Sequence, residues 1–201
     1  LSDKQTLAFQ QIKQGFVTKD VVLLHGVTAS GKTEIYIKLI QEALSENKQV
    51  LYLLPEIALT AQIINRLRLY FGDRVGVYHS KYNNHERLEI WSDLSQGKRF
   101  SVIIGTRSSL FLPFQNLGLI IVDEEHENSF KQYNPNPRYH ARDCSVVLAK
   151  LSGAKVLFGS ATPSIESYYN AKNNKYSLVE LHTRFNNVKM PEVEIIDLKY
   201  C

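Results

Sequence analysis

One short stretch near the amino terminus constrains the fold more than any other. An apolar run at residues 21–24 leads almost directly into Gly26-Val27-Thr28-Ala29-Ser30-Gly31-Lys32-Thr33, which has the spacing G-x-x-x-x-G-K-T. Gly26 and Gly31 permit backbone conformations and close approaches that a side chain would block. The pattern predicts a strand, a tight loop and a helix in direct succession.

The chemistry of this loop indicates a triphosphate ligand. The amides of the loop and of the following helix start would point at the phosphates, where the helix terminus favours negative charge. Lys32 supplies positive charge for the β- and γ-phosphates, and the Thr33 hydroxyl can bind Mg²⁺. The alternative is a chance match in an ordinary strand–helix connection. We predict nucleotide binding by Gly26, Val27, Thr28, Ala29, Ser30, Gly31, Lys32 and Thr33.

Composition narrows the class of protein. The 201 residues, 44% of them hydrophobic, can form a full core, and no apolar run approaches the roughly 18 to 20 residues that a membrane span needs. The net charge of +4 permits a nucleic-acid partner without establishing one. Cys144 and Cys201 match no C-x-x-C spacing, and no secretion signal is visible, so we expect a cytoplasmic protein without membrane contact.

Short apolar strands alternate with longer periodic segments along the chain. This alternation predicts an α/β fold with a mostly parallel sheet and helices on both faces. Because the chain starts at Leu1 and stops after an extended-looking segment at 193–197, we expect a piece of a longer protein. One lobe would span 1–182, and 183–201 would be a linker or the start of the next region. Helices are expected at 2–16, 34–46, 58–71, 84–96 and 141–151, and strands at 50–54, 75–78, 101–105, 117–122 and 154–158.

A second motif, Asp123-Glu124-Glu125-His126, ends the predicted strand at 117–122. Acidic residues at the carboxyl end of a parallel strand lie where such sheets bind ligands. Asp123 is therefore placed to hold Mg²⁺, and Glu124 is the candidate base for the attacking water. A run of solvated acids is the alternative. With Lys32, these two residues form the predicted catalytic set.

The remaining candidates concern nucleic acid. Ser160-Ala161-Thr162 follows the last predicted strand and could lie beside the acidic motif, although such residues also cap helices. Thr106 and Arg107 follow another strand, and Thr60 begins a helix, so all three could contact sugar-phosphate. Aromatic residues interleaved with cations suit single-stranded nucleic acid, or else a loop that folds on its own rings. The interleaved set is Phe130, Lys131, Tyr133, Arg138, Tyr139 and Arg142.

The three motifs, in this order, resemble the first motor lobe of superfamily 2 helicases. Within that superfamily the chain is similar to the primosomal replication-restart DNA helicases, and the similarity covers nearly all of it. The residues that carry this similarity are 24–36, 54–60, 79–80, 86–87 with Trp91, 105–111, 123–126, 138–143 and 159–164. Ala29 stands where that family usually has glycine, and residues 81–84 replace the small and apolar residues expected there.

The resemblance implies further roles. It implies a RecA-like phosphate-loop lobe, Gln5 as an adenine-recognition residue, and His126 with Ser160 and Thr162 as the link between nucleotide state and DNA grip. It implies ATP and Mg²⁺ as cofactors, with zinc only outside this chain, and 3′-to-5′ DNA unwinding in a bacterial cytoplasm. The implied partners are single-stranded and forked DNA, other primosome proteins and single-strand-binding proteins.

Three other functions compete with this interpretation. Another superfamily 2 translocase, for instance of the branch-migration type, would share the motifs, although residues 138–143 argue against it. A nucleotide-gated single-stranded DNA-binding module without motor activity is possible for the lobe alone. A small-molecule kinase or a transporter ATPase would need a lid or a Leu-Ser-Gly-Gly-type signature, and the sequence shows neither.

Overall fold

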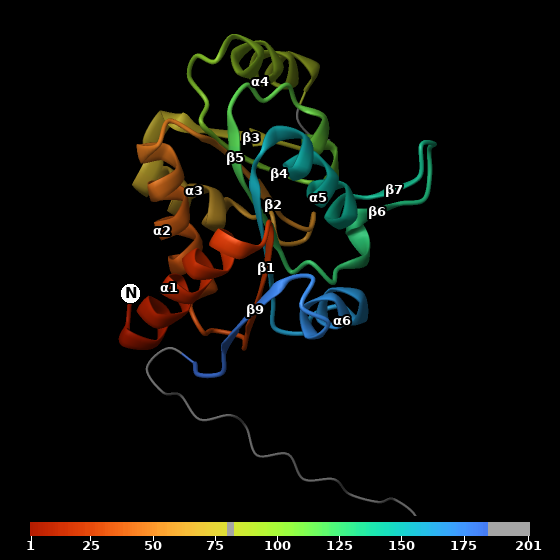
Figure 1. Cartoon of the computed structure of the whole chain (residues 1–201). Helices are drawn as coiled ribbons and strands as arrows, with labels where there is room; N and C mark the ends of the chain where they lie inside the picture. The colour runs from red at the N-terminus through yellow and green to blue at the C-terminus, as the bar shows by residue number, and fades with distance from the viewer. Residues whose placement is uncertain (80–82, 185–201) are drawn as a thin grey trace, which may run out of the picture.

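The computed structural model describes residues 1–79 and 83–184. It contains a sheet of seven strands in the order β3-β4-β2-β5-β8-β1-β9, and every neighbouring pair is parallel (Figure 1). The α/β fold predicted from the sequence is confirmed. The strands are β1 (Val21–Gly26), β2 (Gln49–Leu53), β3 (Val75–Tyr78), β4 (Val102–Gly105), β5 (Leu117–Asp123), β8 (Lys155–Ser160) and β9 (Ser177–Leu181).

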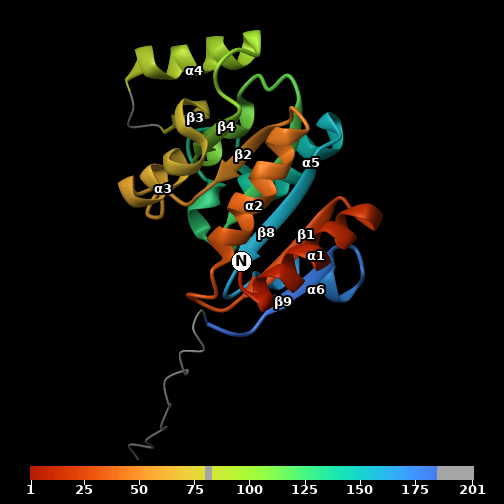
Figure 2. The same cartoon turned by 90° about the vertical axis from the view of Figure 1, so that its left-hand side faces the viewer.

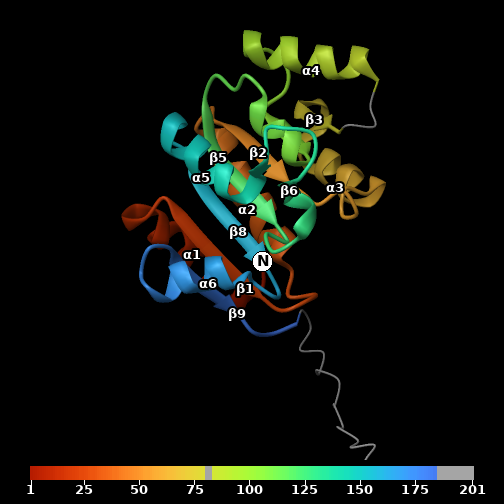
Figure 3. The ribbon, with the colours of Figure 1, turned by 90° about the vertical axis from the view of Figure 1, so that its right-hand side faces the viewer.

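Helices cover both faces of this sheet. The buried residues of α1, α2 and α3 form one cluster with the sheet, and those of α4, α5 and α6 form a second cluster on the opposite face. Figure 2 shows the first group from the front, and Figure 3 shows α5 and α6 from the other side. The helices are α1 (Asp3–Thr18), α2 (Lys32–Ser45), α3 (Ala61–Phe71), α4 (Asn84–Gln96), α5 (Ala141–Ser152) and α6 (Ile165–Lys172), with 3-10 turns η1 (Gly72–Arg74), η2 (Arg107–Phe111) and η3 (Asn128–Phe130).

Central strands in this arrangement are buried on both sides. In β1, Val22 and Leu24 belong to the first cluster, whereas Val21 and Leu23 belong to the second. A strand covered on both faces needs apolar residues at successive positions, which explains the unbroken run before the phosphate loop. That run fixes the strand from which the loop starts.

Some elements differ from the sequence-based expectation. The helix expected at 58–71 begins at Ala61, because residues 55–60 form turns closed by the bond from the Ala58 amide to the Pro55 carbonyl (2.9 Å). The pattern did not predict α6, β9 or the small antiparallel hairpin of β6 (Lys131–Gln132) and β7 (Tyr139–His140). In α6 only Ser167 and Ala171 are buried, so the helix has almost no apolar stripe.

Residues 80–82 and 185–201 lie outside the described part. Lys81, Cys201 and nearly all of the linker predicted at 183–201 are among them. Of the helices described, none combines the length and the apolar character that crossing a membrane requires.

Candidate nucleotide and nucleic-acid site

Three of the predicted motifs follow strands that are neighbours in the sheet. β1 pairs with β8, and β8 pairs with β5, so their carboxyl ends share one edge. Asp123 stands opposite Gly159, and His25 stands opposite Ser160. Open parallel sheets bind ligands at this edge. The fold therefore brings the phosphate loop, the acidic motif and the Ser-Ala-Thr motif together.

A pocket of about 930 Å³ lies beside the phosphate loop. α2 begins immediately after Gly31, whose φ of 82° lies in the left-handed region that glycine tolerates best. The amides at this helix start are suited to phosphate. The pocket is lined by Leu1, Ser2, Gln5, Thr28, Ala29, Ser30, Gly31, Lys32, Thr33, Glu34, Arg66, Asp123 and Glu124.

Gln5 anchors the loop from α1. Its Oε1 accepts a hydrogen bond from the Ser2 amide (2.8 Å), and its Nε2 donates to the Ser30 carbonyl (3.1 Å). The side chain is only 2% exposed, and a Cβ at Gly31 would lie 2.1 Å from Nε2. A second reason for glycine at residue 31 is therefore the close approach of Gln5. Adenine recognition by Gln5 stays a prediction.

Lys32 is held inside the loop. Its Nζ donates to the Gly26 carbonyl (2.8 Å) and lies 4.0 Å from Glu124 Oε1. The ammonium group is thus fixed between the loop and the acidic motif. Because both neighbours are oxygen acceptors, a phosphate oxygen that enters the loop can replace the Gly26 carbonyl as its partner.

Two tyrosines hold the side chain of Asp123. The Tyr36 hydroxyl donates to Oδ1 (3.0 Å) and the Tyr52 hydroxyl donates to Oδ2 (3.1 Å). Burial, followed by the nearby charge of Glu124, raises the pKa of Asp123 to about 6, although both tyrosine bonds and Lys32 oppose the rise. A Cβ at Gly159 would lie 1.8 Å from the Tyr36 hydroxyl, so glycine is needed there.

Neither tyrosine was predicted as a site residue from the sequence. Tyr36 lies one helical turn after Lys32 on the buried face of α2, and Tyr52 lies in β2, which pairs with β5. Their apolar surroundings made them indistinguishable from core residues. A polar hydroxyl in an otherwise apolar stripe is the signal that could have found them, since buried phenols need a partner.

The residues at this edge fit Mg²⁺. Mg²⁺ prefers oxygen ligands and usually keeps several waters, so one carboxylate and one hydroxyl next to nucleotide phosphates suffice. Thr33 and Asp123 line the same pocket. Asp123 Oδ1 accepts from the Tyr36 hydroxyl and from the Glu124 amide (3.1 Å), whereas Oδ2 accepts from the Tyr52 hydroxyl. A carboxylate oxygen has two lone pairs, so Oδ2 keeps one for the metal or for a water bound to it.

His126 connects the acidic motif to the Ser-Ala-Thr motif. Its Nδ1 lies 2.8 Å from Ser160 Oγ and 3.7 Å from Glu124 Oε2, and its Nε2 lies 3.4 Å from Thr162 Oγ1. The Thr162 amide donates to Ser160 Oγ (2.9 Å), which fixes the serine. Glu124 itself has a φ of 48°, a conformation that turns the chain sharply after β5. The structure brings these predicted residues together, and their coupling role stays a prediction.

Arg142 is not placed to contact DNA as predicted. It is 7% exposed, and its Nη1 donates to Glu125 Oε2 (3.3 Å) and to Ser164 Oγ (2.6 Å). Glu125, fully buried, also accepts from the Ser164 amide (2.7 Å) and from Ser167 Oγ (2.8 Å). A buried carboxylate requires such donors, so Arg142 fixes the start of α5 and α6 to the acidic motif. The prediction treated Arg142 as a surface cation, and that was wrong.

Phe130 is likewise not available for stacking on a base. It is 1% exposed and belongs to the core cluster beneath α5. Residue 130 ends the turn η3, which directs its ring inward and leaves Lys131 at the start of the hairpin. This part of the aromatic-loop prediction is therefore corrected.

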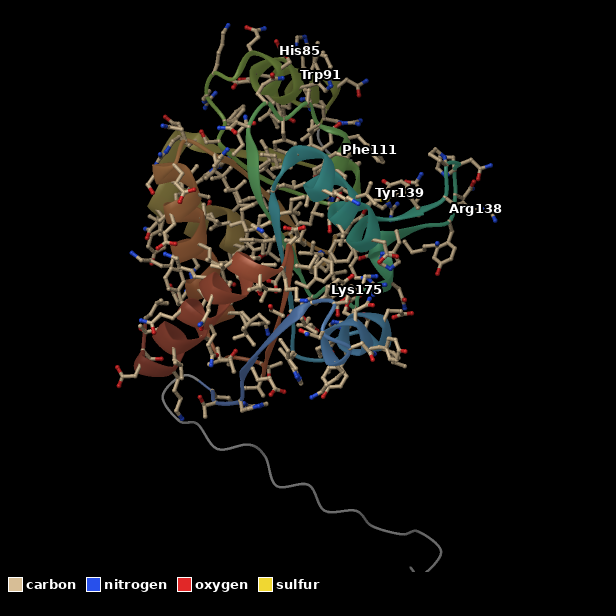
Figure 4. All side chains as sticks on the ribbon, viewed as in Figure 1. His85, Trp91, Phe111, Arg138, Tyr139 and Lys175 are labelled. Atoms are coloured by element: carbon tan, nitrogen blue, oxygen red, sulfur yellow. The ribbon has the colours of Figure 1, made fainter. Side chains whose placement is uncertain are left out.

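Most of the other nucleic-acid candidates lie in the β6–β7 hairpin or are tied to the segment before it. Tyr133 is 66% exposed and Lys131 is half-buried. Arg138 is exposed and Tyr139 is half-buried (Figure 4). Arg107 Nη1 donates to the Ser129 carbonyl (2.9 Å), which ties η2 to the segment before the hairpin. Thr106 follows β4 and is 3% exposed, so its side chain is not placed for the predicted contact with sugar-phosphate. Thr60 is exposed at the start of α3.

The family follows from comparison with known proteins. Residues 2–171 match the DEAD/DEAH box helicase family, and the chain belongs to it. Membership implies ATP binding, in agreement with the phosphate loop.

Particular relatives share more than the family fold. The chain is 43% identical over 201 residues to the replication restart protein PriA of Bacillus subtilis, covering 99% of the chain and 25% of that protein. It is 47% identical over 201 residues to the PriA of Haemophilus influenzae, covering 99% and 27%. The chain thus spans about a quarter of the length of the curated relatives it matches.

Solved structures agree on the architecture. RecG bound to a three-way DNA junction has a TM-score of 0.67 at 23% identity, covering 94% of this chain and 25% of that one. The helicase MrfA bound to DNA and AMPPNP has a TM-score of 0.63 at 18% identity, covering 93% and 27%. These similarities confirm a RecA-like helicase lobe as the fold.

Proposed function

We propose that this chain is the first motor lobe, residues 1–182, of an ATP-dependent DNA helicase that restarts stalled replication forks. One observation carries the proposal: the phosphate loop, Asp123 and Glu124 line one pocket, and His126 connects Glu124 to Ser160 and Thr162. The names of the bacterial relatives support replication restart as the context. The cytoplasm as its location rests on the family resemblance. Polarity from 3′ to 5′ rests on the family resemblance alone.

The geometry suits phosphoryl transfer to water. ATP would place its phosphates over residues 26–33, where Lys32 exchanges the Gly26 carbonyl for phosphate oxygen. Thr33 and Asp123 would hold Mg²⁺, which supplies positive charge next to the phosphates. Glu124 would orient the attacking water and take its proton, since its carboxylate reaches the pocket. Gln5 would recognise adenine from the base of α1.

His126 would couple the state of the bound nucleotide to the DNA contacts. When the γ-phosphate is lost, the partners of Glu124 change, and the bonds from His126 to Ser160 and Thr162 carry that change to the neighbouring strand end. Single-stranded and forked DNA would lie along the hairpin side, contacting Arg107, Lys131, Tyr133, Arg138 and Tyr139, with Thr60 as a further contact at the start of α3. Other primosome proteins and single-strand-binding proteins are the proposed protein partners, and zinc would bind only in other parts of the intact protein.

Mutation of the intact protein that contains this chain tests the proposal. Lys32→Ala and Glu124→Gln should each lower DNA-stimulated ATP hydrolysis by at least about a hundredfold and abolish unwinding, because positioning and charge supply most of this catalysis. Glu46→Gln, at the exposed end of α2, is the matched control and should leave both activities unchanged. Retained unwinding in either variant would remove that residue from its role.

A nucleotide-gated DNA-binding module is the second candidate for the lobe alone. Arg66 is the one arginine among the described residues that line the pocket, and it pairs with Glu34. Helicases of this kind complete the site with an arginine that can raise the rate by orders of magnitude. We expect the 201 residues alone to bind nucleotide weakly and hydrolyse it slowly or not at all. Robust DNA-stimulated hydrolysis by this chain would contradict that expectation.

A further inference from the structure

Phe111 is a large apolar side chain that the fold keeps in solvent. It ends η2 and is 64% exposed, whereas the preceding Leu110 is 5% exposed and belongs to the core. Burial of Leu110 fixes the orientation of the turn, so the exposed position of Phe111 is set by the fold. No nucleic-acid contact was predicted for Phe111 from the sequence.

The ring of Phe111 has an aromatic neighbour on the hairpin. Its centroid lies 5.1 Å from that of Tyr139, and the ring planes meet at 81°, an edge-to-face pair. Such pairs are favourable, and the perpendicular arrangement leaves ring surface of Phe111 open to solvent. The pair links two segments that are far apart in the sequence, η2 and β7 (Figure 4).

Two arginines lie close to this pair in the chain or in space. Arg107 starts the same turn, and its charge acts on the Tyr139 hydroxyl, where it lowers the pKa that burial raises. Arg138 is exposed immediately before Tyr139. An exposed ring between cations meets the two requirements of single-stranded nucleic acid, a surface for base stacking and charge for the phosphates.

Comparison with Trp91, another exposed aromatic residue, shows how the neighbouring charges matter. Trp91 on α4 is 50% exposed and shares a shallow groove with Leu88, but Glu86 and Glu89 line the same groove. Carboxylates beside a ring repel phosphates. Charge therefore favours nucleic acid at Phe111 and disfavours it at Trp91.

We propose that Phe111 is a base-stacking residue on the path of the single strand. One unpaired base stacks on its open ring surface, Tyr139 supports the ring through the edge-to-face contact, and Arg107 and Arg138 attract the flanking phosphates. Stacking needs a ring surface and no base-specific hydrogen bond, so the site accepts any of the four bases. The inference rests on the proposed DNA-binding function and adds a residue to it.

The test measures binding of an oligonucleotide to the intact protein. Phe111→Ala and Phe111→Leu should each weaken binding of unstructured single-stranded DNA by about five- to a hundredfold, because both lose the ring. Phe111→Tyr should bind within about twofold of the unsubstituted protein. Since none of these changes removes a charge, the dependence of affinity on salt should keep its slope. Leu151→Ala, at an 81% exposed position on α5, is the control.

The possible outcomes distinguish the stacking role of Phe111 from the proposed DNA-binding function. Unchanged affinity in Phe111→Ala would overturn the stacking role while DNA binding stands. Normal affinity in Phe111→Leu with weak affinity in Phe111→Ala would overturn it too, because packing against Tyr139 would then be the relevant contact. Failure of the unsubstituted protein to bind single-stranded DNA would contradict the proposed function itself. Quenching of 2-aminopurine in the oligonucleotide, lost in Phe111→Leu and retained in Phe111→Tyr, would report stacking directly.

Discussion

Asp123 and Arg138 both present charge to the proposed ligands, but the protein holds them very differently. Asp123 accepts hydrogen bonds from Tyr36 and Tyr52, one on each carboxylate oxygen. Arg138 is exposed near the end of a hairpin whose strands have two residues each. The nucleotide end, meaning the acidic motif and the residues that hold it, is thus anchored in the core. The proposed DNA-binding hairpin lies outside the core.

The difference follows from what each region has to do. Phosphoryl transfer depends on charges that are already oriented before the reaction, and burial with fixed donors provides that orientation. A surface that grips successive nucleotides instead needs rings and cations that accept many backbone conformations. Changes at the nucleotide end should therefore cost stability, and changes on the hairpin should affect binding alone.

The largest effect on stability is expected at the Glu125–Arg142 pair. Arg142→Met leaves the buried Glu125 carboxylate without its cation, which costs about 3–5 kcal/mol of unfolding free energy. The measurement is equilibrium denaturation of the chain at pH 7. A loss below about 1 kcal/mol would show that the serine donors alone satisfy Glu125, and the contrast between the buried site and the exposed hairpin would weaken.

The exposed Arg99–Glu89 pair provides the matched control. Its side chains are 51% and 63% exposed, so Arg99→Met should cost about 0–1 kcal/mol. If both variants lost the same stability, burial would not distinguish the two regions.

The raised pKa of Asp123 predicts that the stability of the nucleotide-free protein depends on pH. Its pKa is raised to about 6 in the folded state from the ordinary value of 3.8, so the folded state binds the proton more tightly. Its contribution to stability is fully present below about pH 4 and is lost as pH rises through about 6, a change of about 3 kcal/mol. Denaturation between pH 4 and 7 in a metal chelator measures this change.

Substitutions at the same site sharpen the measurement. Asp123→Asn cannot titrate, so this component of the pH dependence should disappear. The Tyr36 hydroxyl donates to the charged carboxylate and so lowers the pKa of Asp123. Tyr36→Phe removes this donor, and the loss of stability should therefore move to higher pH. A move to lower pH would mean that the hydroxyl favours the neutral acid.

How far the sequence predicted this site depends on whether the information is local. The phosphate loop and Asp123 were predicted because each follows its strand within a few residues. Arg142 was misassigned because its partner Glu125 lies 17 residues away, and a cation in a helix start does not reveal its partner. The Ser30 partner of Gln5, 25 residues away, was invisible for the same reason.

Side-chain direction in short turns was the second limit. Composition placed Phe130 in an aromatic and basic segment, but a three-residue 3-10 turn has no periodicity from which to tell the buried side from the exposed one. The edge strand β9 was missed for a related reason. Its Glu180 is exposed, and its pairing with β1 joins segments more than 150 residues apart.

The smallest expected effect on stability is at Arg138. Arg138→Ala removes an exposed cation that has no role in the core, so the denaturation midpoint should stay unchanged. The affinity of the intact protein for single-stranded DNA should fall, and the slope of log affinity against log salt should become shallower by about 0.7, the value for one phosphate contact. Lys150→Ala, an exposed cation on α5, should change neither quantity. A lower midpoint in Arg138→Ala would mean that the hairpin is part of the folded core, and the contrast with Asp123 would fail.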